Sequence, residues 1–187
     1  KRIRDLSEDK NIPVLAFVED VAASGGYWLA CAADEIFASK ASIIGSIGVV
    51  SSGFGFDKAI KKIGVDRRLY TSGENKAILD PFLPENKDDI KRLKDIQKEL
   101  HNQFISFVKS RRGSKITNEN KDLFTGAFWS GEKSLELGLI DDYGEMKSVL
   151  KQRFGENVKI KEFAPKKKLF GFSNLFSGAI DILISKI

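Results

Sequence analysis

Ser24 is followed at once by two glycines, in a context where a serine hydroxyl could act as a nucleophile. A continuous apolar run at 12–20 precedes it and predicts a buried strand, and the run from Gly25 to Ala33 predicts a short helix. The first amides of a helix have no intrahelical acceptor, so the Gly25 N–H could help to hold an oxyanion while Ser24 attacks a carbonyl carbon. The alternative is that Ser24 only caps the helix, as serine commonly does.

A serine nucleophile needs a base, and the single histidine is badly placed for that role. His101 lies within a long predicted helix near the edge of its apolar stripe, which favours a packing or solvated role over a Ser-His-Asp triad. Lys76 is the candidate base, because Ala77, Ile78 and Leu79 follow it and apolar surroundings disfavour an ammonium ion. Its spacing alone also fits an ordinary exposed loop lysine.

Other kinds of chemistry find little support in the composition. Cys31 lies among leucine and alanine, which predicts a buried small side chain, and a single cysteine excludes an internal disulfide. No Cys/His cluster has zinc-site spacing, and the glycine-rich run from Gly45 matches neither a dinucleotide nor a phosphate loop. We therefore expect no metal and no cofactor. The net charge of +5 is spread among acidic residues, so nucleic acid is not an expected partner.

The elements that must position these residues alternate between strands and helices. This order predicts an α/β domain with a largely parallel sheet. Strands are expected at 12–18, 35–38, within 42–52, and at 65–71, 139–140 and 158–163. Helices are expected at 1–10, 25–33, 56–63, 87–112, 131–137 and 145–154, with Gly64 ending the third and a loop at 72–86.

The two ends of the chain carry separate expectations. Lys1–Lys10 is typical of the end of an amphipathic helix, and a parallel sheet would need an earlier strand, so we expect an N-terminally truncated domain at 1–163. Residues 164–187 are a basic linker and an amphipathic helix. That helix is too short, and too polar on one face, to span a bilayer. It could pack on a partner subunit or the core, or lie on a membrane surface.

Four stretches together resemble the signal peptide peptidase A / SohB family of Ser-Lys peptidases. They are AASGGYWLACAADEIFA around Ser24, IIGSIGVV around Ser46, YTSGENKAILDPF around Lys76, and FTGAFWSGEKSLELGLIDDYG near the end of the domain. The resemblance implies that Ser24 is the nucleophile, that Lys76 is the general base, that Ser46 orients the lysine, and that Gly25 donates to the oxyanion. A second oxyanion donor comes in this family from an upstream glycine-rich loop, which has no counterpart in this chain.

The resemblance also implies an architecture and a setting. The fold would be ClpP/crotonase-like, and the reaction would be hydrolysis of apolar peptides, such as remnant signal peptides, with neither metal nor nucleotide. Members form rings in which neighbouring protomers share sites. They usually carry an N-terminal membrane anchor, which implies a membrane-associated protein, with the periplasmic or extracytoplasmic side favoured in a bacterium.

Two other functions remain open from the residues alone. One is a ring-forming membrane scaffold without catalytic activity. The other is a crotonase-type acyl-CoA enzyme on the same fold, in which Ser24 and Lys76 would be incidental. Turnover of a thioester would distinguish the acyl-CoA enzyme, and assembly without any turnover would distinguish the scaffold.

Overall fold

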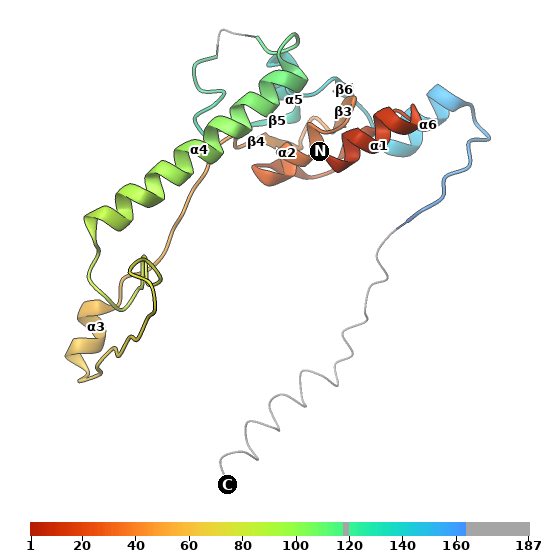
Figure 1. The fold of residues 1–187 in the computed structure, drawn as a ribbon. Coiled ribbons are helices and arrows are strands. Elements are labelled where there is room, and N and C mark those ends of the chain that lie inside the picture. Colours follow the sequence, from red (N-terminus) through yellow and green to blue (C-terminus); the bar gives the residue numbers. More distant parts are fainter. Residues whose placement is uncertain (118–119, 164–187) are drawn as a thin grey trace.

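A computed structural model describes residues 1–117 and 120–163 (Figure 1). The expected C-terminal helix at 164–187 lies outside the described residues. The helices are α1 (Arg2–Lys10), α2 (Gly25–Ala30), α3 (Asp57–Lys62), α4 (Lys87–Arg112), α5 (Gly131–Glu136) and α6 (Met146–Phe154). The strands are β1 (Leu15–Val18), β2 (Val21–Ala23), β3 (Glu35–Ala38), β4 (Ile43–Gly45), β5 (Phe128–Ser130) and β6 (Asp142–Tyr143).

The strands form two small sheets, and most of their pairings are parallel. One sheet has the order β1-β3-β6, with both pairings parallel. The other has the order β2-β4-β5, in which β4 pairs parallel with β2 and antiparallel with β5. The expected α/β class with a largely parallel sheet is therefore confirmed.

Three of the predicted strands are wrong. Residues 65–71 and 158–163 are not strands, and the buried pair Leu139-Ile140 precedes β6 instead of forming it. The segment at 65–71 is exposed throughout, so its β-favouring side chains have no strand beside them in this chain. An apolar run predicts burial better than it predicts strand pairing, because pairing requires the rest of the fold to place another strand next to it.

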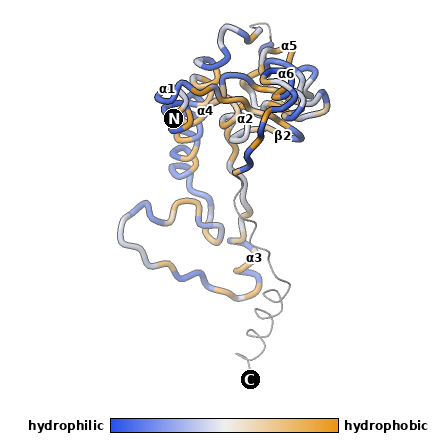
Figure 2. The backbone as a smooth tube through the Cα atoms, turned by 90° about the vertical axis from the view of Figure 1, so that its right-hand side faces the viewer, coloured by the Kyte–Doolittle hydropathy of each residue, from blue (hydrophilic) through white to orange (hydrophobic). Residues whose placement is uncertain are grey.

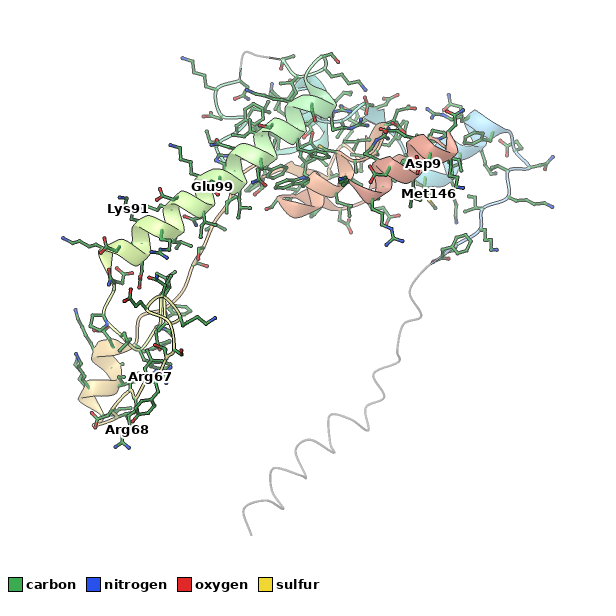
Figure 3. The ribbon with its side chains drawn as sticks, in the orientation of Figure 1. Asp9, Arg67, Arg68, Lys91, Glu99 and Met146 are labelled. Atoms are coloured by element: carbon green, nitrogen blue, oxygen red, sulfur yellow. The ribbon has the colours of Figure 1, made fainter. Side chains whose placement is uncertain are left out.

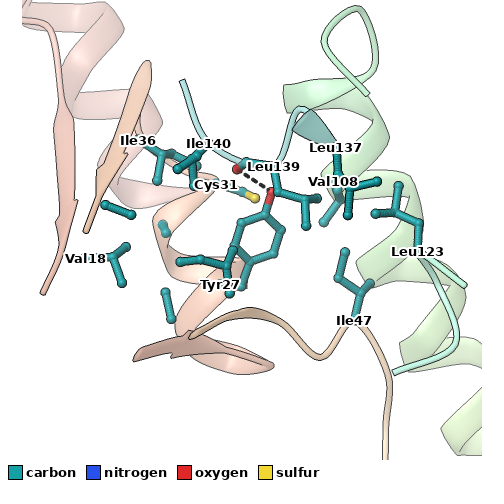
Figure 4. Packing of buried hydrophobic residues seen from close by; sticks show 14 of the residues in the cluster. Val18, Tyr27, Cys31, Ile36, Ile47, Val108, Leu123, Leu137, Leu139 and Ile140 are labelled. Atoms are coloured by element: carbon teal, nitrogen blue, oxygen red, sulfur yellow. Dashed lines mark hydrogen bonds between the residues drawn. The ribbon is translucent and has the colours of Figure 1, made fainter. Parts of the chain in front are cut away.

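The hydrophobic core gathers around α2 and the loop after α5. Tyr27 is fully buried, and its hydroxyl donates a 2.8 Å hydrogen bond to the carbonyl oxygen of Leu139 (Figure 4). Trp28 stacks on Phe104 of α4, with ring centroids 4.5 Å apart. Both aromatic side chains thus belong to the core, and they hold α2 in place beneath its exposed first turn.

Two arginines fix the C-terminal end of α4 to this core. Arg111 donates to the carbonyl oxygens of Cys31 and Ala33, 3.1 and 2.9 Å away. Arg112 is 2% exposed, and it binds both the Gly138 carbonyl oxygen and the Asp141 carboxylate, the latter at 2.6 Å. A charge this deeply buried is stable only when it is paired in this way.

The chain between the core and α4 extends away from the core as an arm, defined here as residues 51–86. Figures 1 and 2 show the arm, with α3, near the far end of α4. Arg67 and Arg68 mark its tip, and Met146 lies at the opposite side of the molecule (Figure 3). Several apolar side chains of the arm are exposed, among them Ile63 at 74% and Tyr70 at 89%.

Candidate active site

Ser24 lies at a sharp corner where β2 ends and α2 begins. Its φ and ψ are 52° and −122°, a conformation that costs a residue other than glycine about 1–3 kcal/mol. The residue is exposed, and its hydroxyl makes no capping bond to α2. The Ser24 hydroxyl therefore does not cap the helix, which was the alternative role. Strained positions of this kind persist where the surrounding structure holds them, and they cluster at functional sites.

The two glycines after Ser24 lie next to open space. A Cβ atom built on either Gly25 or Gly26 would meet no atom within 4 Å outside the local helix. Packing therefore does not require glycine at these positions, and a ligand backbone could approach them closely. Among the described residues the Gly25 N–H has no backbone acceptor, as expected for the first amide of a helix.

Ser46 lies beside Ser24 because their strands pair. Ala23 lies opposite Gly45 in the β2–β4 register, and the Ser24 N–H donates to the Gly45 carbonyl oxygen at 2.9 Å. Ser46 is half-buried and also has a left-handed backbone, with φ 52°. The structure thus brings three of the four predicted site residues, Ser24, Gly25 and Ser46, to one corner.

Lys76 is not at that corner in the same chain. Its neighbours Glu74, Asn75, Ala77 and Ile78 lie along residues 88–95 of α4, whereas α2 packs on Phe104 and Phe107. These two parts of α4 are separated by about 14–29 Å, at 1.5 Å per residue. Lys76 is exposed in its loop. Within one copy of the chain, the serine corner and the lysine loop are therefore not brought together.

An apolar groove of about 590 Å³ adjoins the serine corner. It runs between α1, β1 and α2, and β1 is the edge strand of its sheet. Its lining includes Ile3, Val18, Ala22, Gly26, Leu29 and Ala33. Sequence reasoning missed this groove, because it depends on how three separate elements pack and no local pattern reports that.

The other chemically reactive side chains, Cys31 and His101, lie in different surroundings from the Ser24 hydroxyl. Cys31 is fully buried, and burial raises the pKa of its thiol to about 11, so it is not a nucleophile. The His101 ring lies 3.0 Å from the carbonyl oxygen of Ile47, a contact that its helical pattern did not predict. Within residues 1–117 and 120–163, no group of His, Cys, Asp and Glu is arranged to hold a metal ion.

Residues 7–161 match the family described as Peptidase family S49. This chain belongs to that family. The matched region includes the serine corner, the arm and α4. The resemblance seen in the four sequence stretches is therefore confirmed.

S49 relatives include a SohB protease from Buchnera aphidicola of Schlechtendalia chinensis, 41% identical over 71% of this chain and 43% of that protein. A signal peptide peptidase of Enterococcus faecium is 31% identical over 75% of this chain and 40% of that protein. A Brucella abortus protein named Na(+)/H(+) antiporter NhaA is 54% identical over 91% of this chain, but only 23% of that protein is matched. The chain thus spans half or less of these relatives.

One solved structure is a membrane-bound stomatin-specific protease in complex with a substrate peptide. The alignment covers 96% of this chain and 89% of the protease chain, with a TM-score of 0.46 and 18% sequence identity. An enoyl-CoA hydratase/isomerase family protein from Hyphomonas neptunium gives a TM-score of 0.38. Both scores lie below 0.5, so the family assignment rests on sequence. In the part of the chain that the structure describes, no helix has the length and apolarity needed to cross a membrane.

Proposed function

We propose that this chain is the catalytic domain of a serine endopeptidase in which Ser24 is the nucleophile and Lys76 of a neighbouring copy is the general base. One observation carries the proposal. Within an S49 domain, the strained and exposed Ser24 has a hydroxyl that makes no capping bond to α2, and it lies beside two glycines that open onto free space. A fold keeps such strain where another requirement holds it in place.

The chemistry follows from the groups at the corner. The Ser24 Oγ attacks the scissile carbonyl carbon, and the uncharged Lys76 amine takes the hydroxyl proton. The Gly25 N–H donates to the oxyanion that forms. Lys76 then returns the proton to the leaving amine, and an acyl-enzyme remains. Water, deprotonated by the same amine, releases the acyl group and restores Ser24. The Ser46 hydroxyl orients the amine.

The division of the site between copies accounts for the position of Lys76. Its loop lies beside the first half of α4, away from the serine corner of its own chain. The arm that carries it exposes Phe54, Ile63 and Tyr70, which are typical of a surface that another subunit covers. A ring in which each arm reaches the neighbouring corner would complete every site. Hydrolysis would then depend on assembly.

The groove next to Gly26 supports apolar peptides as substrates. Its lining is largely alanine, valine, leucine and isoleucine, which suits the side chains of Ala- and Leu-rich segments. The free edge of β1 could pair with an extended peptide backbone. Remnant signal peptides have this composition, so we propose them as the substrate class and a membrane surface as the place of action.

The proposal is tested with the full-length protein and an apolar, signal-peptide-like substrate. Ser24→Ala and Lys76→Ala should each lower cleavage at least about 1,000-fold, because both members of a dyad are required. Lys58→Ala is the matched control, since it removes an exposed lysine from α3 of the same arm. Light scattering checks that every variant assembles. If either test variant cleaves like the unmodified protein, the dyad is wrong.

A ring-forming scaffold is the second candidate, favoured by the exposed apolar surface of the arm. It predicts assembly of the unmodified protein with no turnover of any peptide. An acyl-CoA enzyme predicts thioester turnover that survives Lys76→Ala. The same set of variants therefore separates all three functions.

A further inference from the structure

His101 is the single histidine of the chain, and it reaches from α4 to the backbone next to Ser46. Its Nε2 lies 3.0 Å from the carbonyl oxygen of Ile47, and Ile47 itself is fully buried. A carbonyl oxygen only accepts, so this nitrogen must carry the proton and donate. Phe104 and Val108, one and two turns further along α4, pack into the core.

The backbone that His101 contacts is a strained turn. Gly45 and Ser46 both have positive φ, 112° and 52°. The Ser46 N–H donates to the Ala127 carbonyl oxygen at 2.7 Å, and the Gly48 N–H donates to the Ser46 carbonyl oxygen at 2.9 Å. A Cβ on Gly48 would lie 3.0 Å from the Gly126 Cα, so the turn lies tightly against the segment before β5.

Besides the β2–β4 pairing at Gly45, the turn is held from two further sides. The segment before β5 holds it on one side through Ala127 and Gly126, and α4 holds it on the other through the His101 ring. A left-handed conformation at a non-glycine residue persists only where contacts with the surrounding structure hold it in place. Removing one of these supports should therefore loosen the turn.

We propose that His101 is a positioning residue for the active site. Its Nε2–H bond to Ile47 keeps the Ser46 turn in its left-handed conformation, which holds Ser46 beside Ser24. The same bond fixes the point from which the chain leaves the core toward the arm. The catalytic part of this inference rests on the proposed function, whereas its effect on the turn does not.

The turn itself can be tested without any substrate. In His101→Leu, hydrogen exchange of the Ser46 and Gly48 amides should accelerate about 10-fold, the change expected for the loss of one hydrogen bond. His101→Gln should exchange like the unmodified protein, because its carboxamide N–H₂ can donate in place of Nε2. Equal exchange in the leucine variant and the unmodified protein would overturn the proposal.

The ring of the unmodified protein gives a second readout that needs no variant. With a single histidine, the ¹⁵N spectrum of its side chain has one pair of ring signals. The proposal requires a protonated Nε2 at neutral pH. A neutral ring with its proton on Nδ1 would overturn it, even if the leucine variant failed to fold.

The catalytic role is tested by a double-mutant cycle with Ser46. His101→Leu should lower kcat about 10-fold with KM nearly unchanged, and His101→Gln should recover most of kcat. In a Ser46→Ala background, His101→Leu should cause little further loss, because it acts through Ser46. Additive losses, or equal kcat values in the leucine and glutamine variants, would overturn the role. If Ser24→Ala stays active in the same assay, the proposed function fails instead.

Discussion

At the scale of single residues, the serine corner is defined by backbone conformation as much as by side-chain type. Ser24 and Ser46 both have φ 52°, and a 2.9 Å bond from the Ser24 N–H to the Gly45 carbonyl oxygen joins their strands. Two adjacent strained residues in a small domain are a considerable cost. Their coincidence with the opening at Gly25 and Gly26 is what makes this corner a candidate site.

The strain at Ser24 gives a stability prediction separate from activity. Ser24→Gly should be at least as stable as Ser24→Ala, since glycine adopts a positive φ freely while alanine keeps the Cβ that opposes it. Denaturant unfolding should give the glycine variant a free energy of unfolding higher by about 1 kcal/mol. Both variants should be inactive. A more stable alanine variant would show that the corner is not strained.

At Gly26, which lies next to open space, substitution by alanine should increase stability while lowering activity. Gly26→Ala should raise the free energy of unfolding by about 0.5–1 kcal/mol, because alanine favours a helix over glycine. It should lower kcat/KM, because the new methyl group projects into the groove that the substrate would occupy.

Gly53→Ala provides the matched control for that substitution. Gly53 in the arm also has open space around its Cβ position but lies outside the groove. The kcat/KM of the Gly53→Ala variant should equal that of the unmodified protein. Equal activity of the two alanine variants would place the substrate elsewhere.

At the scale of elements, the sequence predicted the helices better than the strands. The apolar stripe at 87–112 is a local signal, and α4 has the expected bounds. The short strands depend on distant partners, so β5 was not expected, and 65–71 was wrongly predicted to be a strand. The motifs likewise located Ser24, Ser46 and Lys76 along the chain. They carried no information on the groove or on His101, which arise from packing between elements.

The exposed apolar side chains of the arm give a prediction about assembly. Ile63→Asp should weaken the proposed oligomer by at least about 10-fold in dissociation constant, because it places a charge where a partner would bury an apolar side chain. The melting temperature of the dissociated protein should be unchanged, since Ile63 is exposed in the single chain. Sedimentation at several concentrations measures the first effect.

Phe154→Asp on α6 serves as the control for Ile63→Asp. Phe154 is also an exposed apolar residue, 57% accessible, and α6 lies at the other side of the molecule (Figure 1). It should leave the oligomer intact. If Phe154→Asp dissociates the protein and Ile63→Asp does not, the arm is not the assembly surface.

At the scale of the whole molecule, α4 is joined to the core partly through charged groups, and we expect these to make the fold sensitive to acid. Burial alone would raise the pKa of Asp141, but hydrogen bonds from Arg112, Lys115 and the Ile36 N–H hold it below its ordinary value of 3.8. A carboxyl with a lowered folded-state pKa stabilises the fold at pH values above its unfolded pKa. That stabilisation is lost as the pH falls through the folded pKa.

The prediction is a loss of stability below about pH 4 to which Asp141 contributes. Asp141→Asn should lower the free energy of unfolding at pH 7 by about 3 kcal/mol, because it leaves the buried Arg112 without its counter-charge. The decline from pH 4 to pH 2 should be less steep in this variant than in the unmodified protein. Parallel curves over that range would assign the acid sensitivity to other carboxyls.

The central claim is that a site is completed by two copies, one giving Ser24 and the other Lys76. Mixing the inactive Ser24→Ala and Lys76→Ala proteins in equal amounts, with exchange of subunits, tests it most directly. The account predicts that peptide cleavage returns to about one quarter of the unmodified level, because in a randomly mixed ring that share of sites pairs an intact serine with an intact lysine. No recovery, despite proven subunit exchange, would place both residues of each site in one chain and contradict the account.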